Sequence, residues 1–191
     1  MAGLTILQSN GTTFSANVDV SDTDTGTITL TDTSNDKHIR FEGNLTADNL
    51  TTVAQGYRLF LIGDTTTFTN AVSFQNADNV ALGNEVGDSL TFNGGLTTTG
   101  VSGGGTVFIN GTIQTSNDAV VLGAVTLGSN TTIDTNATDG TGDITIAAVT
   151  GGNNTLTLTT ENNIANADIT ASGNISGVTT LTLADVGGIA T

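Results

Sequence analysis

The 191-residue sequence contains no Cys, no Pro and no Trp, and only 3 of its residues are Lys or Arg. Without Cys the chain has no disulfide bonds, no thiolate metal ligands and no cysteine nucleophile. Without Pro it is neither a collagen nor a polyproline rod. Proteins bind the phosphate backbone through clustered Lys and Arg, so the shortage of basic side chains argues against nucleic acid as a partner.

Acidic residues outnumber basic ones by 18 to 3, which gives a formal net charge of −15. The basic residues are Lys37, Arg40 and Arg58, and none follows Arg58. This imbalance argues against anionic membranes and favours salty surroundings or divalent cations as counter-charge. The longest apolar run, Ala119–Val125, is far shorter than the roughly 20 residues of a membrane-spanning helix, so we expect no membrane insertion.

The residues that are abundant predict an all-β protein. Thr, Asn and 25 Gly residues stand where the strong helix formers Lys, Glu, Arg and Met are scarce. β-branched residues favour strands, and Gly and Asn favour tight turns. The same residue types run from end to end without a linker, so we expect one continuous structural unit.

Short strands of the form apolar-x-apolar recur along the sequence at nearly regular intervals. The interval is too short for a βαβ unit and suits one turn of a parallel β-solenoid. The sequence therefore predicts an all-β parallel β-helix with about 18 residues per rung and roughly ten rungs, stacked about 4.8 Å apart. The strands are Val72–Phe74, Leu90–Phe92, Val107–Ile109, Val125–Leu127, Ile144–Ile146, a weaker one near Ile164, and Leu181–Leu183.

The middle residue of each triplet is expected on the outer surface, because successive side chains of a strand point to opposite faces. If the triplets stack directly on one another, their middle residues form one outward column. Threonine suits such a column, since β-branched side chains pack well on a pleated surface. The predicted column is Ser73, Thr91, Phe108, Thr126, Thr145 and Thr182.

Residues 1–58 differ in composition from the remainder of the chain. They hold every basic residue, the single His38 and the only Tyr. The end of a solenoid exposes unpaired strand edges, which an atypical terminal segment commonly protects. We therefore expect residues 1–58 to form a cap or irregular rungs, and residues 59–191 to form a regular β-solenoid.

The repeats resemble those of giant bacterial surface proteins of the filamentous-haemagglutinin and autotransporter-adhesin type. The likeness lies in period and residue style, and it is clearest from Val72 to Leu183. It implies a right-handed parallel β-helix that is secreted or held at the bacterial cell surface as a stalk or adhesin. The implied partners are host or neighbouring cell-surface proteins, glycans, or copies of the chain itself. The segments that carry the resemblance are Gly142–Ile146, Asn154–Leu158, Asn162–Asn166, Ile169–Gly173 and Val178–Leu183.

Catalysis has few candidate residues, and we expect no enzyme activity. His38 lies near Asp36 and Glu42 and could act as a base, but a solvated charged turn explains it more simply. Polysaccharide-cleaving solenoids combine clustered carboxylates with a basic partner, and no basic residue follows Arg58. The carboxylates from which a glycosidase pair could be drawn are Asp64, Asp78, Glu85 and Asp88.

Calcium is the one cofactor that the sequence suggests. Hard cations bind carboxylate and carbonyl oxygens in acidic turns. Neither candidate turn completes an EF-hand or a repeated G-G-x-G-x-D motif, so solvated acidic turns are the simpler explanation. The candidate ligands are Asp19, Asp22 and Asp24 in one turn, and Asp139 and Asp143 in another.

Alternating Thr residues between Thr25 and Thr33, with Thr157 and Thr159, are similar to the flat Thr arrays of ice-binding solenoids. Such arrays need parallel Thr columns, whereas the sequence aligns only one column, which Phe108 interrupts. The sequence therefore favours a non-enzymatic structural or adhesive segment of an extracellular bacterial surface protein. The alternatives are a self-assembling extracellular filament or surface-layer subunit, with or without a dependence on calcium, an ice-binding solenoid and a polysaccharide-active solenoid.

Overall fold

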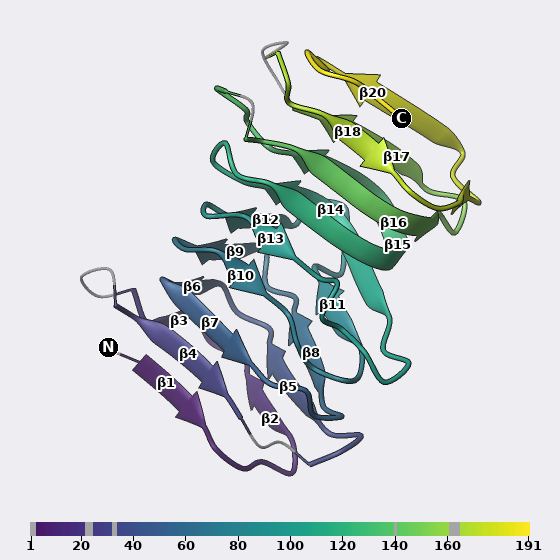
Figure 1. Cartoon of the computed structure of the whole chain (residues 1–191). Helices are drawn as coiled ribbons and strands as arrows, with labels where there is room; N and C mark the ends of the chain where they lie inside the picture. The colour runs from purple at the N-terminus through teal and green to yellow at the C-terminus, as the bar shows by residue number, and fades with distance from the viewer. Residues whose placement is uncertain (1–2, 22–24, 32–33, 140, 161–164) are drawn as a thin grey trace.

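A computed structural model describes residues 3–21, 25–31, 34–139, 141–160 and 165–191. In these ranges all regular structure is β-strand, from β1 to β20, and every pairing between strands is parallel (Figure 1). The predicted all-β parallel solenoid is thereby confirmed. Within the described ranges we find no helix of the length and apolarity that crossing a bilayer requires.

Each turn of the chain contributes strands to three faces, and we call the strands of one turn a level. Face 1 contains β1 (Gly3–Ile6), β4 (Thr27–Leu30), β7 (Asn49–Thr52), β10 (Val72–Ser73), β13 (Leu96–Thr97), the starts of β15 (Val120–Asp134) and β16 (Ile144–Thr150), and β18 (Ile169–Ala171).

Face 2 contains β2 (Thr12–Phe14), β5 (His38–Phe41), β8 (Arg58–Leu61), β11 (Val80–Leu82), the start of β14 (Val107–Gln114), the middle of β15, the end of β16, and β19 (Ile175–Ser176). Face 3 contains β3 (Val18–Asp19), β6 (Leu45–Ala47), β9 (Thr65–Phe68), β12 (Ser89–Phe92), the ends of β14 and β15, β17 (Thr155–Thr159) and β20 (Thr180–Ala184).

The solenoid has about seven turns rather than the predicted ten rungs. Val120 pairs with Ile144, and Val80 pairs with Val107, so these levels use more chain than the predicted period allows. The predicted period holds only locally, where Val107 pairs with Val125. Elsewhere the predicted period is shorter than the length of chain in one turn, because apolar triplets that follow one another in the sequence lie on different faces. The sequence pattern does not distinguish one face from another.

The predicted single outward column is wrong for the same reason. Phe108 and Thr126 pair on face 2, but the other members are divided between face 1 and face 3. The predicted alternation holds at five of the six positions, where the residue on either side is buried. Those five are Ser73, Thr91, Phe108, Thr126 and Thr145, whereas Thr182 lies between exposed neighbours. Ile164, which begins the weaker triplet, lies outside the described residues.

The interior is filled by columns of apolar side chains that stack from level to level. On face 2 the inward column consists of buried aliphatic residues, such as Leu59, Val80 and Val107. Burial ends at the last described level: Leu156 and Leu158 are 0% and 1% exposed, whereas Leu181 and Leu183, which pair with them, are 44% and 46% exposed. A complete apolar interior therefore needs a neighbouring level on both sides.

On faces 2 and 3 the described part of residues 1–58 belongs to the same ladders as the later strands, whereas on face 1 β1, β4 and β7 form a separate three-stranded sheet. His38 in β5 pairs with Arg58 in β8, so the parallel pairing on face 2 crosses position 58 without a break. Side-chain amides support the turns between strands: Asn44 Oδ1 accepts a hydrogen bond from the N–H of Thr65, and Asn130 Oδ1 accepts one from Thr155. These bonds join successive levels at positions where the backbone ladder is interrupted.

Candidate functional site

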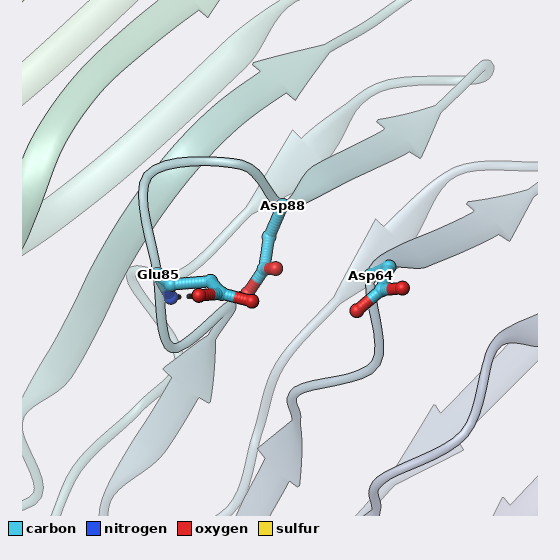
Figure 2. A group of neighbouring side chains, drawn as sticks. All are labelled: Asp64, Glu85 and Asp88. Atoms are coloured by element: carbon cyan, nitrogen blue, oxygen red, sulfur yellow. Dashed lines mark hydrogen bonds between the residues drawn. The ribbon is translucent and has the colours of Figure 1, made fainter.

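Three carboxylates from two adjacent levels gather at one corner of the solenoid. Asp64 lies in the turn before β9, while Glu85 and Asp88 lie in the loop between β11 and β12 (Figure 2). Each residue places a carboxylate oxygen within 4.8 Å of the others. This is the only group of three potential metal-ligating side chains in the described residues.

The loop between β11 and β12 holds Asp88 in place. Asp88 is 2% exposed, and its Oδ2 accepts hydrogen bonds from the N–H groups of Asn84 at 2.6 Å and Glu85 at 3.1 Å. Gly83, with a φ of 76°, begins this loop, and a Cβ at that position would lie 2.6 Å from the carbonyl oxygen of Asn110. The tight loop therefore requires glycine at its start and orients a buried carboxylate toward Glu85.

The cluster has no basic partner. The three salt bridges of the described chain join Arg40 to Glu42, and Arg58 to Asp36 and Asp78. Hard divalent cations such as calcium bind several carboxylate and carbonyl oxygens. Within the described residues, Asp64, Glu85 and Asp88 therefore form a group that could hold such an ion.

Two of the four carboxylates from which a glycosidase pair could be drawn, Asp78 and Asp88, do not fit such a pair. Asp78, the fourth candidate, is separate from the cluster and accepts a hydrogen bond from Arg58 Nε at 3.2 Å. Retaining glycosidases place two carboxyl groups about 5–5.5 Å apart on either side of a bound sugar. Asp88 is nearly buried and held by two N–H groups, so it does not reach a polysaccharide outside the solenoid.

The first predicted calcium turn is described at only one of its three carboxylates, because Asp22 and Asp24 lie outside the described residues. Asp19 follows Val18 in β3, and its Oδ1 accepts hydrogen bonds from the Ser21 hydroxyl at 2.7 Å and the Ser21 N–H at 3.0 Å. The hydroxyl bond is the main cause of a lowered pKa for the Asp19 carboxyl. Closure of this turn explains Asp19 without a metal, and calcium binding there stays a prediction.

Asp139 and Asp143, the second predicted pair, have different roles. Asp139 Oδ1 accepts hydrogen bonds from the Thr141 hydroxyl at 2.7 Å and the Thr141 N–H at 2.9 Å. These bonds, the hydroxyl bond above all, and one from Asn117 lower the pKa of Asp139. Asp143 Oδ1 accepts a hydrogen bond from the N–H of Asp168 in the next level. The geometry thus gives each carboxylate a structural partner, and a shared calcium ion stays a prediction.

A second polar group covers the outer surface of face 2. The Arg40 guanidinium lies 5.4 Å from the centre of the Phe60 ring, and the His38 ring meets the same ring edge-on at 6.3 Å. Arg40 Nε also donates a hydrogen bond to Glu42 at 2.8 Å. We call His38, Arg40 and Phe60 the cation–aromatic patch. The sequence places His38 close to Arg40, but only the register of β5 and β8 puts Arg40 directly beside Phe60.

No known protein-family model, curated protein or solved structure matches this chain. The functional argument therefore depends on the geometry of the solenoid and its surface groups.

Proposed function

We propose that this chain is a non-enzymatic structural segment of an extracellular bacterial surface protein, and that it acts as a stalk or adhesin. The observation that carries the proposal is the parallel pairing that extends over three faces and about seven turns. Each level is hydrogen-bonded to the levels above and below it, which favours a stiff rod. The absence of Lys and Arg after Arg58 supports an extracellular role, because trypsin-like proteases cleave after these residues.

A stalk is expected to tolerate a change of length if whole levels are removed. Val120 and Ile144 occupy equivalent positions on face 1, as do Leu122 and Ile146. Deletion of residues 120–143 therefore joins Ala119 to Ile144 and removes one level while preserving the order of the three faces. Deletion of residues 120–131 is the matched control, because it removes the face 1 and face 2 strands of one level and leaves only face 3 residues of that level.

Small-angle scattering and circular dichroism test this modular behaviour. The 120–143 deletion is expected to keep the β spectrum and to shorten the particle by about 5 Å, the spacing of one strand. The 120–131 deletion is expected to lose stability and cooperative unfolding. Equal damage from both deletions would show that the chain is not a modular rod, and the stalk proposal would then be abandoned.

The adhesive part of the proposal is supported by the cation–aromatic patch. Aromatic rings and guanidinium groups are common anchors at binding surfaces. Beads coated with the purified chain are expected to adhere to bacterial or host cells, and R40A combined with F60S is expected to weaken that adhesion severalfold. T145A on face 1 is the control. Adhesion that is absent, or equal for all three proteins, would leave only the stalk function.

Calcium-dependent stiffening is a second candidate, which the Asp64–Glu85–Asp88 cluster favours. An ion at this cluster would join two adjacent levels and remove the repulsion between three carboxylates. Millimolar calcium is expected to raise the melting temperature of the wild type but not of E85Q. D139N serves as the control for the turn predicted from the sequence, and a calcium response lost only in D139N would place the ion there instead.

A further inference from the structure

Asparagine followed directly by glycine occurs three times in the sequence, and the structure gives the three pairs different surroundings. Such a pair can deamidate without an enzyme, because glycine has no Cβ to obstruct the attack of its backbone nitrogen on the asparagine side chain. The fold decides whether the attacking nitrogen and the side-chain amide are available for this reaction. The pairs are Asn10–Gly11, Asn93–Gly94 and Asn110–Gly111.

The pair Asn110–Gly111 is protected by hydrogen bonds. Asn110 is 7% exposed, and its Nδ2 donates to the carbonyl oxygen of Gly83 at 3.0 Å. The N–H of Gly111 donates to the hydroxyl oxygen of Ser129 at 3.1 Å. The fold therefore holds both the amide that would leave and the nitrogen that would attack.

The other two pairs differ at the attacking nitrogen. Asn10 is exposed, but the N–H of Gly11 donates to the hydroxyl oxygen of Ser9 at 3.0 Å. Within the described ranges, neither the side chain of Asn93 nor the N–H of Gly94 has a hydrogen-bond partner. Asn93 is also partly exposed, so water reaches it. Of the three pairs, Asn93–Gly94 thus combines a free nucleophile with an unrestrained amide.

Asn93 and Gly94 are the central residues of the tight turn between β12 and β13. The N–H of Gly95 donates to the carbonyl oxygen of Phe92 at 2.8 Å and closes this turn. A Cβ on Gly94 would clash with the backbone nitrogen of Ala71 in the preceding level. The packing therefore requires glycine at position 94 and leaves no room for a longer backbone in the turn.

We propose that Asn93 is a site of spontaneous deamidation, with water as the only co-reactant. The backbone nitrogen of Gly94 loses its proton and bonds to Cγ of Asn93, and the Cγ–Nδ2 bond breaks to release ammonia. Water then opens the resulting succinimide ring at either of its two carbonyl groups, which gives aspartate or isoaspartate. The sum is a hydrolysis of the amide, and no atom is oxidised or reduced.

The modification changes both the charge and the backbone of the turn. Each product adds one carboxylate to a chain whose formal net charge is already −15. Isoaspartate also lengthens the main chain, because the backbone then runs through the former side chain. We expect this longer turn to displace β13 from β10 and β15, with which it pairs. Deamidation would thus loosen face 1 irreversibly as the protein ages, an effect that does not depend on the stalk or adhesin function.

Peptide mapping of the purified full chain tests this selectivity. The chain is incubated at mildly alkaline pH, folded in one sample and unfolded in urea in the other. Pepsin digestion at low pH, where the reaction stops, and mass spectrometry then measure the conversion of each amide to a carboxyl. We expect similar rates at the three sites in urea, and a severalfold faster reaction at Asn93 than at Asn10 or Asn110 in the folded chain. A folded-state rate at Asn93 that does not exceed both others would overturn the proposal.

Two variants of position 93 test the structural consequence. Aged wild type is expected to contain isoaspartate, detected by enzymatic methylation of its carboxyl, and to show faster hydrogen exchange in β13 than fresh protein. N93S lacks the amide and is expected to show neither change. N93D carries the charge on a backbone of normal length and is expected to exchange like fresh wild type. Exchange in N93D as fast as in aged wild type, or equal ageing of N93S, would overturn the displacement of β13 by a lengthened turn.

Discussion

The corner that follows face 3 is filled by aromatic rings in the early levels and by buried threonines in the later ones. Phe68 and Phe92 stack there, with ring centres 5.7 Å apart. In the parallel register Thr91 aligns with Gln114, Asp134 and Thr159 of the successive levels. Phe92 comes directly after Thr91, so the residues directly after Gln114, Asp134 and Thr159 occupy the position equivalent to that of Phe92. They are Thr115, Thr135 and Thr160, which are 2%, 0% and 0% exposed.

The two kinds of corner solve the same problem with different interactions. The rings fill the interior by their volume, and Phe74 adds an edge-to-face contact with Phe92. The threonines fill less space, and their hydroxyls donate to backbone carbonyls such as Gly142 O, at 2.6 Å from Thr135 Oγ1. Strand length differs together with the type of corner: β12 has 4 residues, whereas β15 has 15 and passes through all three faces. A smaller interior is therefore compatible with a backbone ladder that continues around the corners.

The largest effect is expected from removing a ring of the early corner. F92A would leave a cavity beside Phe68 and Phe74 and is expected to lower the free energy of unfolding by about 3–5 kcal/mol. Chemical denaturation measures the loss, and hydrogen exchange is expected to locate it in β9 and β12. A loss below about 1 kcal/mol would show that the rings do not determine the stability of the early levels.

The second-largest effect on the free energy of unfolding is expected only at alkaline pH. Burial raises the pKa of Tyr57 from 10.0 to about 12. The folded state holds this proton more tightly than the unfolded state, so the stabilisation is complete below pH 10 and is lost as the pH rises toward 12. The loss is expected to reach about 2–3 kcal/mol. Denaturation at several pH values checks it, and Y57F is expected to lack this component; identical pH profiles for both proteins would contradict the assignment.

A buried hydroxyl of the late corner is expected to have a smaller effect. T135V keeps the shape of the side chain but leaves the carbonyl of Gly142 without its hydroxyl donor, which is expected to cost about 1–3 kcal/mol. Urea denaturation of T135V and F92A, measured side by side, compares the two kinds of corner directly. A neutral T135V would mean that the late corner is held by packing alone.

The smallest expected effect is an increase in the free energy of unfolding rather than a decrease. Thr66 is 1% exposed, and its hydroxyl oxygen has no hydrogen-bond partner in the described part of the chain. T66V removes an unsatisfied buried polar group between Leu45 and Leu90, with which Thr66 pairs, and is expected to stabilise the protein by about 1 kcal/mol. Differential scanning calorimetry is sensitive enough to detect it. A destabilised T66V would reveal that the hydroxyl has a partner, such as a buried water.

The sequence predicts the parallel solenoid because apolar alternation and turn residues are local features. Val107–Ile109 and Val125–Leu127 are recognisable as strands, and they do stack. The face to which a strand belongs depends on turn lengths that vary along the chain, so the sequence alone aligns Leu90–Phe92 with strands of other faces. The grouping of Asp64 with Glu85 and Asp88 depends on the register between adjacent levels. The spacing of acidic residues along the sequence does not show this register, and it therefore points to other carboxylates.

The distance along the chain between paired residues also shapes how the protein folds. Val120 finds its partner Ile144 one turn later, and no strand pairing in the described residues spans more chain than that of Val80 with Val107. Closing a loop of this size costs nearly the same entropy at every level, whatever the total length of the rod. Growth can therefore proceed level by level from any formed nucleus, and a longer solenoid need not fold through contacts that are more remote in sequence.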